Sequence, residues 1–314
     1  MFFGTPEFAV PCLTALCDVA QVTLVVSQPD RRAGRGLRVT APPVKNAALA
    51  RGIEVIQPTK IRTPAFAERL HNEHADVAVV IAYGRILPQP VLDAPRLGCV
   101  NVHASLLPEL RGAAPIQWAI IRGLARTGVC LMRMDAGMDT GPVLARRVID
   151  IGAEETAGDL STRLSALGGD LLRQELPRYL ADQLAAEPQD HVRATTAPLL
   201  RKEDGRVDWS RRASEVHDLV RGVQPWPGAW SMLADARVKI HRARVLSTAG
   251  SDAPAGTVLA VAGDGKRAGP REQIEIACGV GTILVAELQS EGGRRMSAAQ
   301  FCVGQRLRAG ARFG

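Results

Sequence analysis

The first half of the chain alternates short, largely apolar runs with stretches of helical periodicity. Several of these runs are rich in β-branched side chains and end at turn signals, as expected of buried strands. The predicted strands cover residues 22–26, 76–82, 98–103 and 127–134, and helical patterns cover 64–74 and 114–121. Strands that alternate with helices predict a parallel sheet with helices on both faces. Ligands then bind beyond the carboxyl ends of the strands.

The second half has a different pattern. A helical stretch over residues 155–184 is followed by a polar segment and then by short apolar runs between turn signals, which is typical of a small β-barrel. The short runs cover residues 238–240, 256–261, 273–277 and 282–286, and a helical pattern at 213–221 precedes them. We therefore predict an α/β protein. It has a Rossmann-like parallel-sheet domain over 1–184, a linker over 185–202 and an OB-like β-barrel domain over 203–314.

Composition excludes several classes of protein. No apolar run approaches the ~20 residues that a membrane-spanning helix needs. The start MFFGTPEF lacks the basic and apolar regions of a secretory signal. The six cysteines are scattered without a Cys-x-x-Cys pair, which favours buried free thiols over a disulfide framework or a zinc site. These features predict a soluble cytoplasmic protein.

Charge is distributed unevenly along the chain. Residues 201–314 hold 18 Lys and Arg against 12 Asp and Glu, a net charge of +6, whereas residues 1–200 hold 21 against 20, a net charge of +1. A basic surplus either keeps a surface soluble or attracts a polyanion such as nucleic acid. The distribution suggests catalysis in the N-terminal part and binding of a partner by the C-terminal part.

Two neighbouring segments carry candidate chemistry. If residues 100–103 are extended, Asn101 and His103 lie on one face, because side chains alternate along a strand. The Asn101 amide can donate to a developing oxyanion, and His103 can transfer a proton. The glycine-rich loop after the next predicted strand carries Asp139, whose carboxylate can fix the tautomer of His103. Each residue alone has a structural explanation, but together at two strand ends they favour carbonyl chemistry.

Longer motifs extend this interpretation. NVHASLLPELRGAAPIQWAI at 101–120 resembles the signature of the folate-dependent formyltransferases, and DAGMDTGPVL at 135–144 resembles its companion loop. Four more segments resemble those members of the superfamily that act on methionyl-tRNA. These are GTPEFAV at 4–10, QPDRRAGRG at 28–36, AYGRILP at 82–88 and PWPGAW at 225–230. The resemblance covers essentially the whole chain.

The resemblance implies a reaction and its site. The donor would be 10-formyltetrahydrofolate, the acceptor the α-amine of methionyl initiator tRNA, and no metal would be required. Asn101, His103 and Asp139 fall on the family's catalytic positions. The positions implied for folate binding are Ser105, Leu106, Leu107 and Pro108, with Ile86 and Leu87 helping to wall the pterin pocket. We expect a monomer.

The arginine-rich loop after residue 30 has two interpretations. It is either a solvated charged loop or a set of phosphate contacts, and the resemblance favours contacts with the tRNA acceptor stem. The implied tRNA-binding residues are Arg31, Arg32, Arg35 and Arg38.

Other functions remain possible at this point. The acceptor could be an amino sugar nucleotide or glycinamide ribonucleotide, although the latter enzymes lack the extra C-terminal residues and the arginine-glycine loop disfavours the former. A non-catalytic RNA-binding protein could use the same scaffold, but the presence of Asn101, His103 and Asp139 together argues against it.

Overall fold

The computed structural model describes residues 1–33, 38–261 and 273–314. The chain folds into two compact units. Unit 1 comprises residues 1–115, 126–150 and 161–198, and unit 2 comprises residues 116–125, 151–160 and 199–314. Within the described residues, no helix is both long and apolar enough to cross a membrane.

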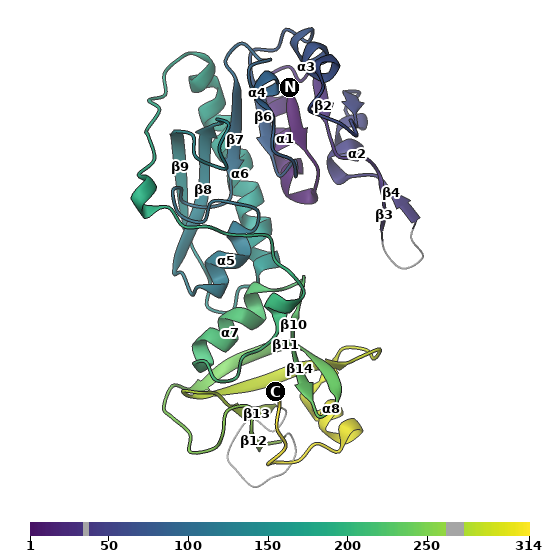
Figure 1. Ribbon diagram of the computed structural model, residues 1–314, viewed down its shortest axis with the longest axis vertical. Coiled ribbons are helices and arrows are strands. Elements are labelled where there is room, and N and C mark those ends of the chain that lie inside the picture. The colour runs from purple at the N-terminus through teal and green to yellow at the C-terminus, as the bar shows by residue number, and fades with distance from the viewer. Residues whose placement is uncertain (34–37, 262–272) are drawn as a thin grey trace. The chain divides into compact units, whose positions relative to one another are not determined.

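Unit 1 is built on a sheet that has seven strands among its described residues, in the order β5-β2-β1-β6-β7-β8-β9 (Figure 1). The strands are β1 (Phe2–Gly4), β2 (Leu24–Val26), β5 (Glu54–Ile56), β6 (Ala78–Ile81), β7 (Cys99–His103), β8 (Arg126–Arg133) and β9 (Val143–Asp150). From β5 to β7 all neighbours are parallel. Since β2 lies on one side of β1 and β6 on the other, the strand order switches there, and ligands of such sheets bind at the carboxyl edge near the switch.

The predicted parallel sheet changes direction at one edge. β8 runs antiparallel to β7, and β9 runs antiparallel to β8. β8 and β9 are joined by residues 134–142 alone, and a parallel connection needs a crossover of a dozen or more residues. The expectation that the strand at 127–134 ends beside the end of β7 is therefore wrong, because its carboxyl end lies at the opposite edge of the sheet.

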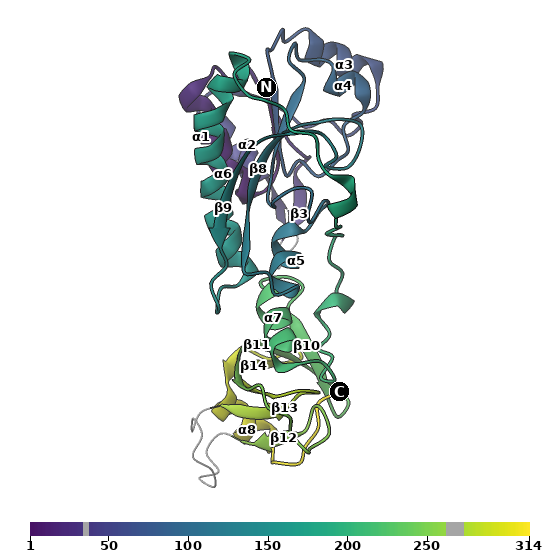
Figure 2. The same cartoon turned by 90° about the vertical axis from the view of Figure 1, so that its left-hand side faces the viewer.

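Helices cover both faces of this sheet. They are α1 (Val10–Val19), α2 (Pro43–Leu49), α3 (Pro64–His71), α4 (Gln89–Leu92) and most of α6 (Ala157–Leu180), whereas α5 (Pro115–Ile121) belongs almost wholly to unit 2. α6 packs on the face that carries Val102, so closely that a Cβ on Gly168 would lie 3.0 Å from the Val102 side chain. α3 and α4 pack on the other face, where Leu70 and Val91 share a core cluster with Cys99 (Figure 2). Asn101 and His103 alternate with Val102 and therefore belong to the α3–α4 face.

Unit 2 contains an antiparallel sheet with the order β10-β11-β14-β13-β12, with β15 added to β14. Its strands are β10 (Ala229–Leu233), β11 (Ala236–Ser247), β12 (Val258–Ala260), β13 (Ile274–Ala277), β14 (Thr282–Ser290) and β15 (Met296–Ser297). Register shifts between β11 and β14 bend the sheet into a half-barrel. α7 (Ala213–Gly222) and α8 (Ala298–Gln305) close it over a core that includes Val216, Ile240 and Phe301. The predicted fold class is confirmed in both units.

Candidate active site

Asn101 and His103 lie side by side on one face of β7. His103 is buried and Asn101 is half-buried. Their antiparallel partners on β8 are Met132 and Cys130, which share the face because paired residues point the same way. The Asn101 side-chain oxygen is buried and has no hydrogen-bond partner among the described residues. A buried amide of this kind is a polar group available to a ligand.

The tautomer of His103 is set by a backbone carbonyl. Nε2 lies 3.0 Å from the Leu110 oxygen, and a carbonyl can only accept, so Nε2 carries the proton in the neutral ring. Nδ1 is then the nitrogen that gains or loses a proton. Asp139 Oδ2 lies 3.7 Å from Nδ1, which is too far for a hydrogen bond, so the carboxylate faces this nitrogen without binding it directly. The predicted role of Asp139 in fixing the tautomer is thus taken by Leu110.

Asp139 reaches this position by an unexpected route. The loop begins at the amino end of β7, where Met134 N donates to the Cys99 oxygen at 2.8 Å. It then returns to His103 at the other end of the strand. Asp139 has a φ of +55°, a left-handed conformation that Asp tolerates better than most residues. Its Oδ2 accepts from Gly112 N at 2.8 Å, which holds the carboxylate beside the histidine.

The loop itself is shaped by Asp135 and a glycine. Asp135 Oδ1 accepts from Gly137 N at 3.0 Å and from the Thr140 hydroxyl at 2.6 Å, so the first carboxylate of the motif organises the loop. A Cβ on Gly141 would lie 1.9 Å from the Arg133 oxygen, which leaves room only for glycine. The two carboxylates therefore have different roles, one in the loop's own structure and one facing His103.

A segment from the predicted linker also contacts this loop. Residues 187–197, which we call the strap, belong to unit 1 and pair with other parts of it at two places. Glu187 exchanges two backbone hydrogen bonds with Val143, and Arg111 N donates to the Thr195 oxygen. Between these points, Gln189 donates to the backbone of the Asp139 loop. Sequence reasoning missed the strap because its composition resembles that of a solvated connection.

The implied folate segment turns most of its side chains into the protein. Ser105 is buried and donates to the Glu109 oxygen at 2.6 Å. Leu106 lies against Gly128 of β8, and Leu107 joins a small buried cluster with Cys130, Met132 and Val143. Pro108 is half-buried. A ligand can therefore meet this turn mainly through its backbone.

The cluster beneath His103 contains a thiol that is chemically quiet. Burial raises the pKa of Cys130 to about 11, so the side chain stays a neutral thiol at physiological pH. Five of the six cysteines are buried, as predicted, and Cys17 is half-buried.

In the turn after β6, one apolar side chain is exposed and the next one is buried. Ile86 is 56% exposed, whereas Leu87 is buried in the cluster beneath α3 and α4. Gln28 holds the root of this turn, because its Nε2 donates to the Tyr83 oxygen and its Oε1 accepts from Arg85. Of the two residues implied for the pterin pocket, Ile86 is therefore free for contact and Leu87 is structural.

In the arginine-rich segment, β3 (Arg31–Ala33) and β4 (Arg38–Thr40) pair antiparallel as the two arms of a hairpin, and these arms stand away from the sheet in Figure 1. Arg31 and Arg32 are exposed. The side chain of Arg38 and the whole of Arg35 lie outside the described residues.

The root of this hairpin is fixed by an ion pair. Lys45 Nζ lies 2.8 Å from Asp30 Oδ2, and this contact lowers the pKa of Asp30. Gln57 Nε2 donates to the same carboxylate and to the Gln28 oxygen, so the exposed arginines start from a rigid base.

No group of three or more His, Cys, Asp or Glu in the described part of the chain is placed to hold a metal ion.

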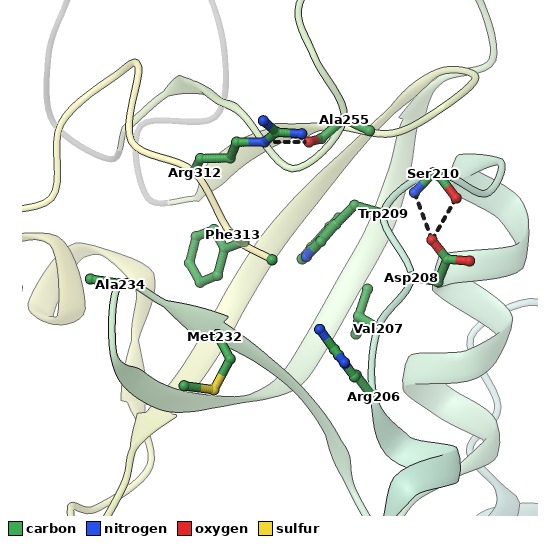
Figure 3. Close-up of a pocket in the computed structure, with 11 residues that line it drawn as sticks. Arg206, Val207, Asp208, Trp209, Ser210, Met232, Ala234, Ala255, Arg312 and Phe313 are labelled. Atoms are coloured by element: carbon green, nitrogen blue, oxygen red, sulfur yellow. Dashed lines mark hydrogen bonds between the residues drawn. The ribbon is translucent and has the colours of Figure 1, made fainter.

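A separate cavity of about 660 Å³ lies in unit 2 (Figure 3). The rings of Trp209 and Phe313 line it, tilted by 48° to each other with their centroids 5.9 Å apart. Two of its polar side chains are engaged with its own walls, because Arg312 donates to the Ala255 oxygen and Asp208 accepts from Ser210. The cavity contains none of the predicted site residues.

Comparisons with known proteins match the chain along its length. A family model described as formyl transferase matches residues 1–176, and one described as formyl transferase, C-terminal domain, matches residues 199–306. The methionyl-tRNA formyltransferase of Sorangium cellulosum is 50% identical over 100% of this chain and 99% of its own length. The chain belongs to the methionyl-tRNA formyltransferase family. The relative from Myxococcus xanthus is also 50% identical, over 99% of this chain and 96% of its own length.

Solved structures share the fold at much lower identity. An N-formyltransferase from Helicobacter canadensis, solved with folinic acid and dTDP-3-aminofucose, superposes with a TM-score of 0.64 at 15% identity. That likeness covers 90% of this chain and 97% of that one. HypX from Aquifex aeolicus, solved with tetrahydrofolic acid, gives a TM-score of 0.60 at 17% identity over 96% of this chain and 46% of its own. At this distance the likeness concerns the fold alone.

Proposed function

We infer that this protein transfers a formyl group from 10-formyltetrahydrofolate to the α-amine of methionyl initiator tRNA for translation initiation. The observation that carries the inference is 50% identity to methionyl-tRNA formyltransferases over the full chain. The grouping of Asn101, His103 and Asp139 at the end of β7 supports it, because these groups suit acyl transfer to an amine.

The described residues fit a formyl donor of this kind. Among the described residues, the buried amide oxygen of Asn101 has no partner, and Ile86 presents an exposed apolar side chain on the turn after β6. We propose that the turn from Ser105 to Pro108, together with Ile86, holds the folate, mainly through backbone groups. When bound, the donor supplies a formyl carbon activated for attack by an amine.

Asn101 has the first role in the transfer. The acceptor amine must be neutral to attack, and negative charge then develops on the formyl oxygen. The Asn101 amide donates a hydrogen bond to that oxygen, and removal of one such donor in other enzymes costs about 10²–10³ in rate. Its unpartnered oxygen can accept from an N–H of the incoming amine.

His103 has the second role. The attacking nitrogen must lose a proton, and the folate nitrogen that leaves must gain one. Nδ1 of His103 takes the proton, because Nε2–H is committed to the Leu110 oxygen. Asp139, 3.7 Å away, stabilises the proton until it passes to the leaving nitrogen.

We propose that unit 2 and the β3–β4 hairpin hold the tRNA. The C-terminal surplus of +6 supports electrostatic attraction, and the exposed Arg31 and Arg32 suit phosphate contacts that position the acceptor stem. The monomeric state and the cytoplasmic location stay predictions.

A competition between acceptors tests the function. The protein is offered 10-formyltetrahydrofolate with methionyl initiator tRNA, an amino sugar nucleotide or glycinamide ribonucleotide, and each acceptor is examined for a formyl group. We expect formylation of the tRNA-borne methionine alone. Formylation of a small acceptor in preference to the tRNA would overturn the assignment, and binding of tRNA without any transfer would indicate an RNA-binding protein.

A further inference from the structure

We propose that Gln189 is a positioning residue for proton transfer at His103, and that Arg111 sets its orientation. The proposal rests on the proposed function, because it assigns Asp139 a role beside His103. Gln189 lies in the strap, outside the motifs that mark the site, and is 7% exposed. It acts through the Asp139 loop and touches neither substrate nor the reacting atoms.

The amide nitrogen of Gln189 faces the Asp139 loop. Its Nε2 donates to the Asp139 oxygen at 2.9 Å and to the Gly141 oxygen at 2.6 Å. Both hydrogens of one amide group are thus used on one loop, on either side of Thr140. The loop has no helix or strand of its own, and Asp139 takes a left-handed φ of +55°, a sparsely populated conformation that persists where surrounding contacts hold it.

Arg111 determines which end of the Gln189 amide faces the loop. Its Nε and Nη2 donate to Gln189 Oε1 at 3.1 and 2.7 Å. A guanidinium can only donate, so Oε1 must face Arg111 and Nε2 must face the loop carbonyls. The orientation of a buried glutamine, usually ambiguous, is fixed here by chemistry.

The carboxylate and the backbone oxygen of Asp139 are held by hydrogen bonds from neighbouring parts of the structure. Its carboxylate accepts from Gly112 N, and its backbone oxygen accepts from Gln189. Arg111, next to Gly112, pairs with the strap through the Thr195 oxygen and Ala197 N. Leu110, the next residue back, holds His103 and is itself held by the Thr195 hydroxyl. The strap therefore fixes the His103–Asp139 distance from both sides.

The variant Gln189→Glu tests the proposal with almost no change in volume. The glutamate keeps its partner Arg111 but has no N–H to donate, so its second oxygen faces two carbonyls. We expect kcat for formylation of methionyl-tRNA to fall about 10-fold to 100-fold, because a catalytic group displaced by about 1 Å costs this much. The KM values of donor and tRNA should change little, since neither contacts Gln189.

A matched control separates positioning from loss of stability. Gln224 of unit 2 also donates to two backbone carbonyls, the Val220 and His241 oxygens. Gln224→Glu should lower the melting temperature by a similar amount and leave kcat at saturating tRNA unchanged, because the Gln224 amide contacts the backbone of unit 2 and no residue of the His103 site. If both variants lose kcat equally, the effect is general destabilisation and the proposal is wrong.

A double variant tests whether Gln189 acts through Asp139. In an Asp139→Asn background, Gln189→Glu should cause little further loss of kcat, because effects of residues that act as a unit are not additive. A full additional 10-fold loss in that background would contradict the proposal.

Arg111→Lys provides a second test if Gln189→Glu folds poorly. Without the guanidinium fork the amide can flip, so a smaller loss of kcat is expected, and unchanged kcat would also count against the proposal.

These results distinguish two kinds of failure. If Asp139→Asn alone leaves kcat unchanged, the proposed site is wrong. If Asp139→Asn is impaired while Gln189→Glu and Arg111→Lys keep full kcat, the site stands and the positioning role falls.

Discussion

Single residues at the site are held by backbone groups more than by other side chains. His103 is oriented by the Leu110 carbonyl, and Asp139 by the Gly112 amide, while the two side chains face each other at 3.7 Å. This arrangement keeps one imidazole nitrogen occupied and leaves the other for chemistry. It also separates the proton-accepting atom from the atom that fixes the ring.

Replacement of His103 by alanine is the first prediction at this scale. Turnover should fall about 10²–10⁴-fold, because the proton acceptor is lost, while tRNA binding stays nearly intact. Steady-state formylation rates and a tRNA-binding titration measure the two effects. His71→Ala, which changes an exposed histidine of α3, serves as the control. Near-normal turnover of His103→Ala would remove His103 from the mechanism.

The alternation of side chains along β7 was enough to predict which residues share a face with His103. Asn101 lies on that face, and Val102 packs beneath α6 on the other. The contributions of Leu110 and Gly112 could not be predicted, because a backbone carbonyl or amide carries no residue-type signal. Gln189 was missed for another reason, since a glutamine in a polar stretch is usually solvated.

Among the structural elements, the loop between β8 and β9 has to connect two places at opposite ends of β7. It must start at the amino end of β7, where β8 ends, and still place Asp139 at the carboxyl end beside His103. Asp135 and Gly141 meet this demand by folding the loop tightly on itself. The pattern at 127–134 predicted β8 well, but strand direction depends on pairing with distant residues, which local periodicity does not encode.

Gly141→Ala is the prediction for this loop. The new Cβ would lie 1.9 Å from the Arg133 oxygen, so the backbone must move. We expect a loss of about 1–3 kcal/mol in the free energy of unfolding, as for other overpacked sites, and a fall in kcat as Asp139 shifts. Denaturant unfolding and formylation kinetics measure both. Gly304→Ala in α8, where a Cβ meets nothing within 4 Å, should be neutral or slightly stabilising. Full activity in Gly141→Ala would show that the loop tolerates displacement.

The whole molecule has two units of different architecture, and its basic surplus is concentrated in the C-terminal part of the chain. The N-terminal 200 residues are nearly neutral, and the remaining residues carry +6. The sequence alone locates this surplus, because charge can be counted without knowledge of the fold. It could not predict that part of the apparent linker pairs with β9 and with the turn after β7.

Salt dependence is the prediction at this scale. The affinity for methionyl initiator tRNA should fall as salt rises, with a slope of log K against log salt of about −2 or steeper, because bound arginines and lysines release counterions from the phosphates. Arg31→Ala with Arg32→Ala should reduce the magnitude of the slope by about 1–2. Arg51→Ala with Arg62→Ala, another exposed pair of unit 1, is the matched control. A slope near zero would rule out an electrostatic hold on the tRNA.

The position of the strap in the chain determines when the site can exist during synthesis. When residue 184 has just been added, the nascent chain already contains Asn101, His103 and Asp139, but it lacks Gln189 and Thr195. The Asp139 loop and the turn at Leu110 then have no anchor from the strap. Formyl transfer by this protein should therefore begin only after residue 197 has left the ribosome, well after the last strand of the sheet is made.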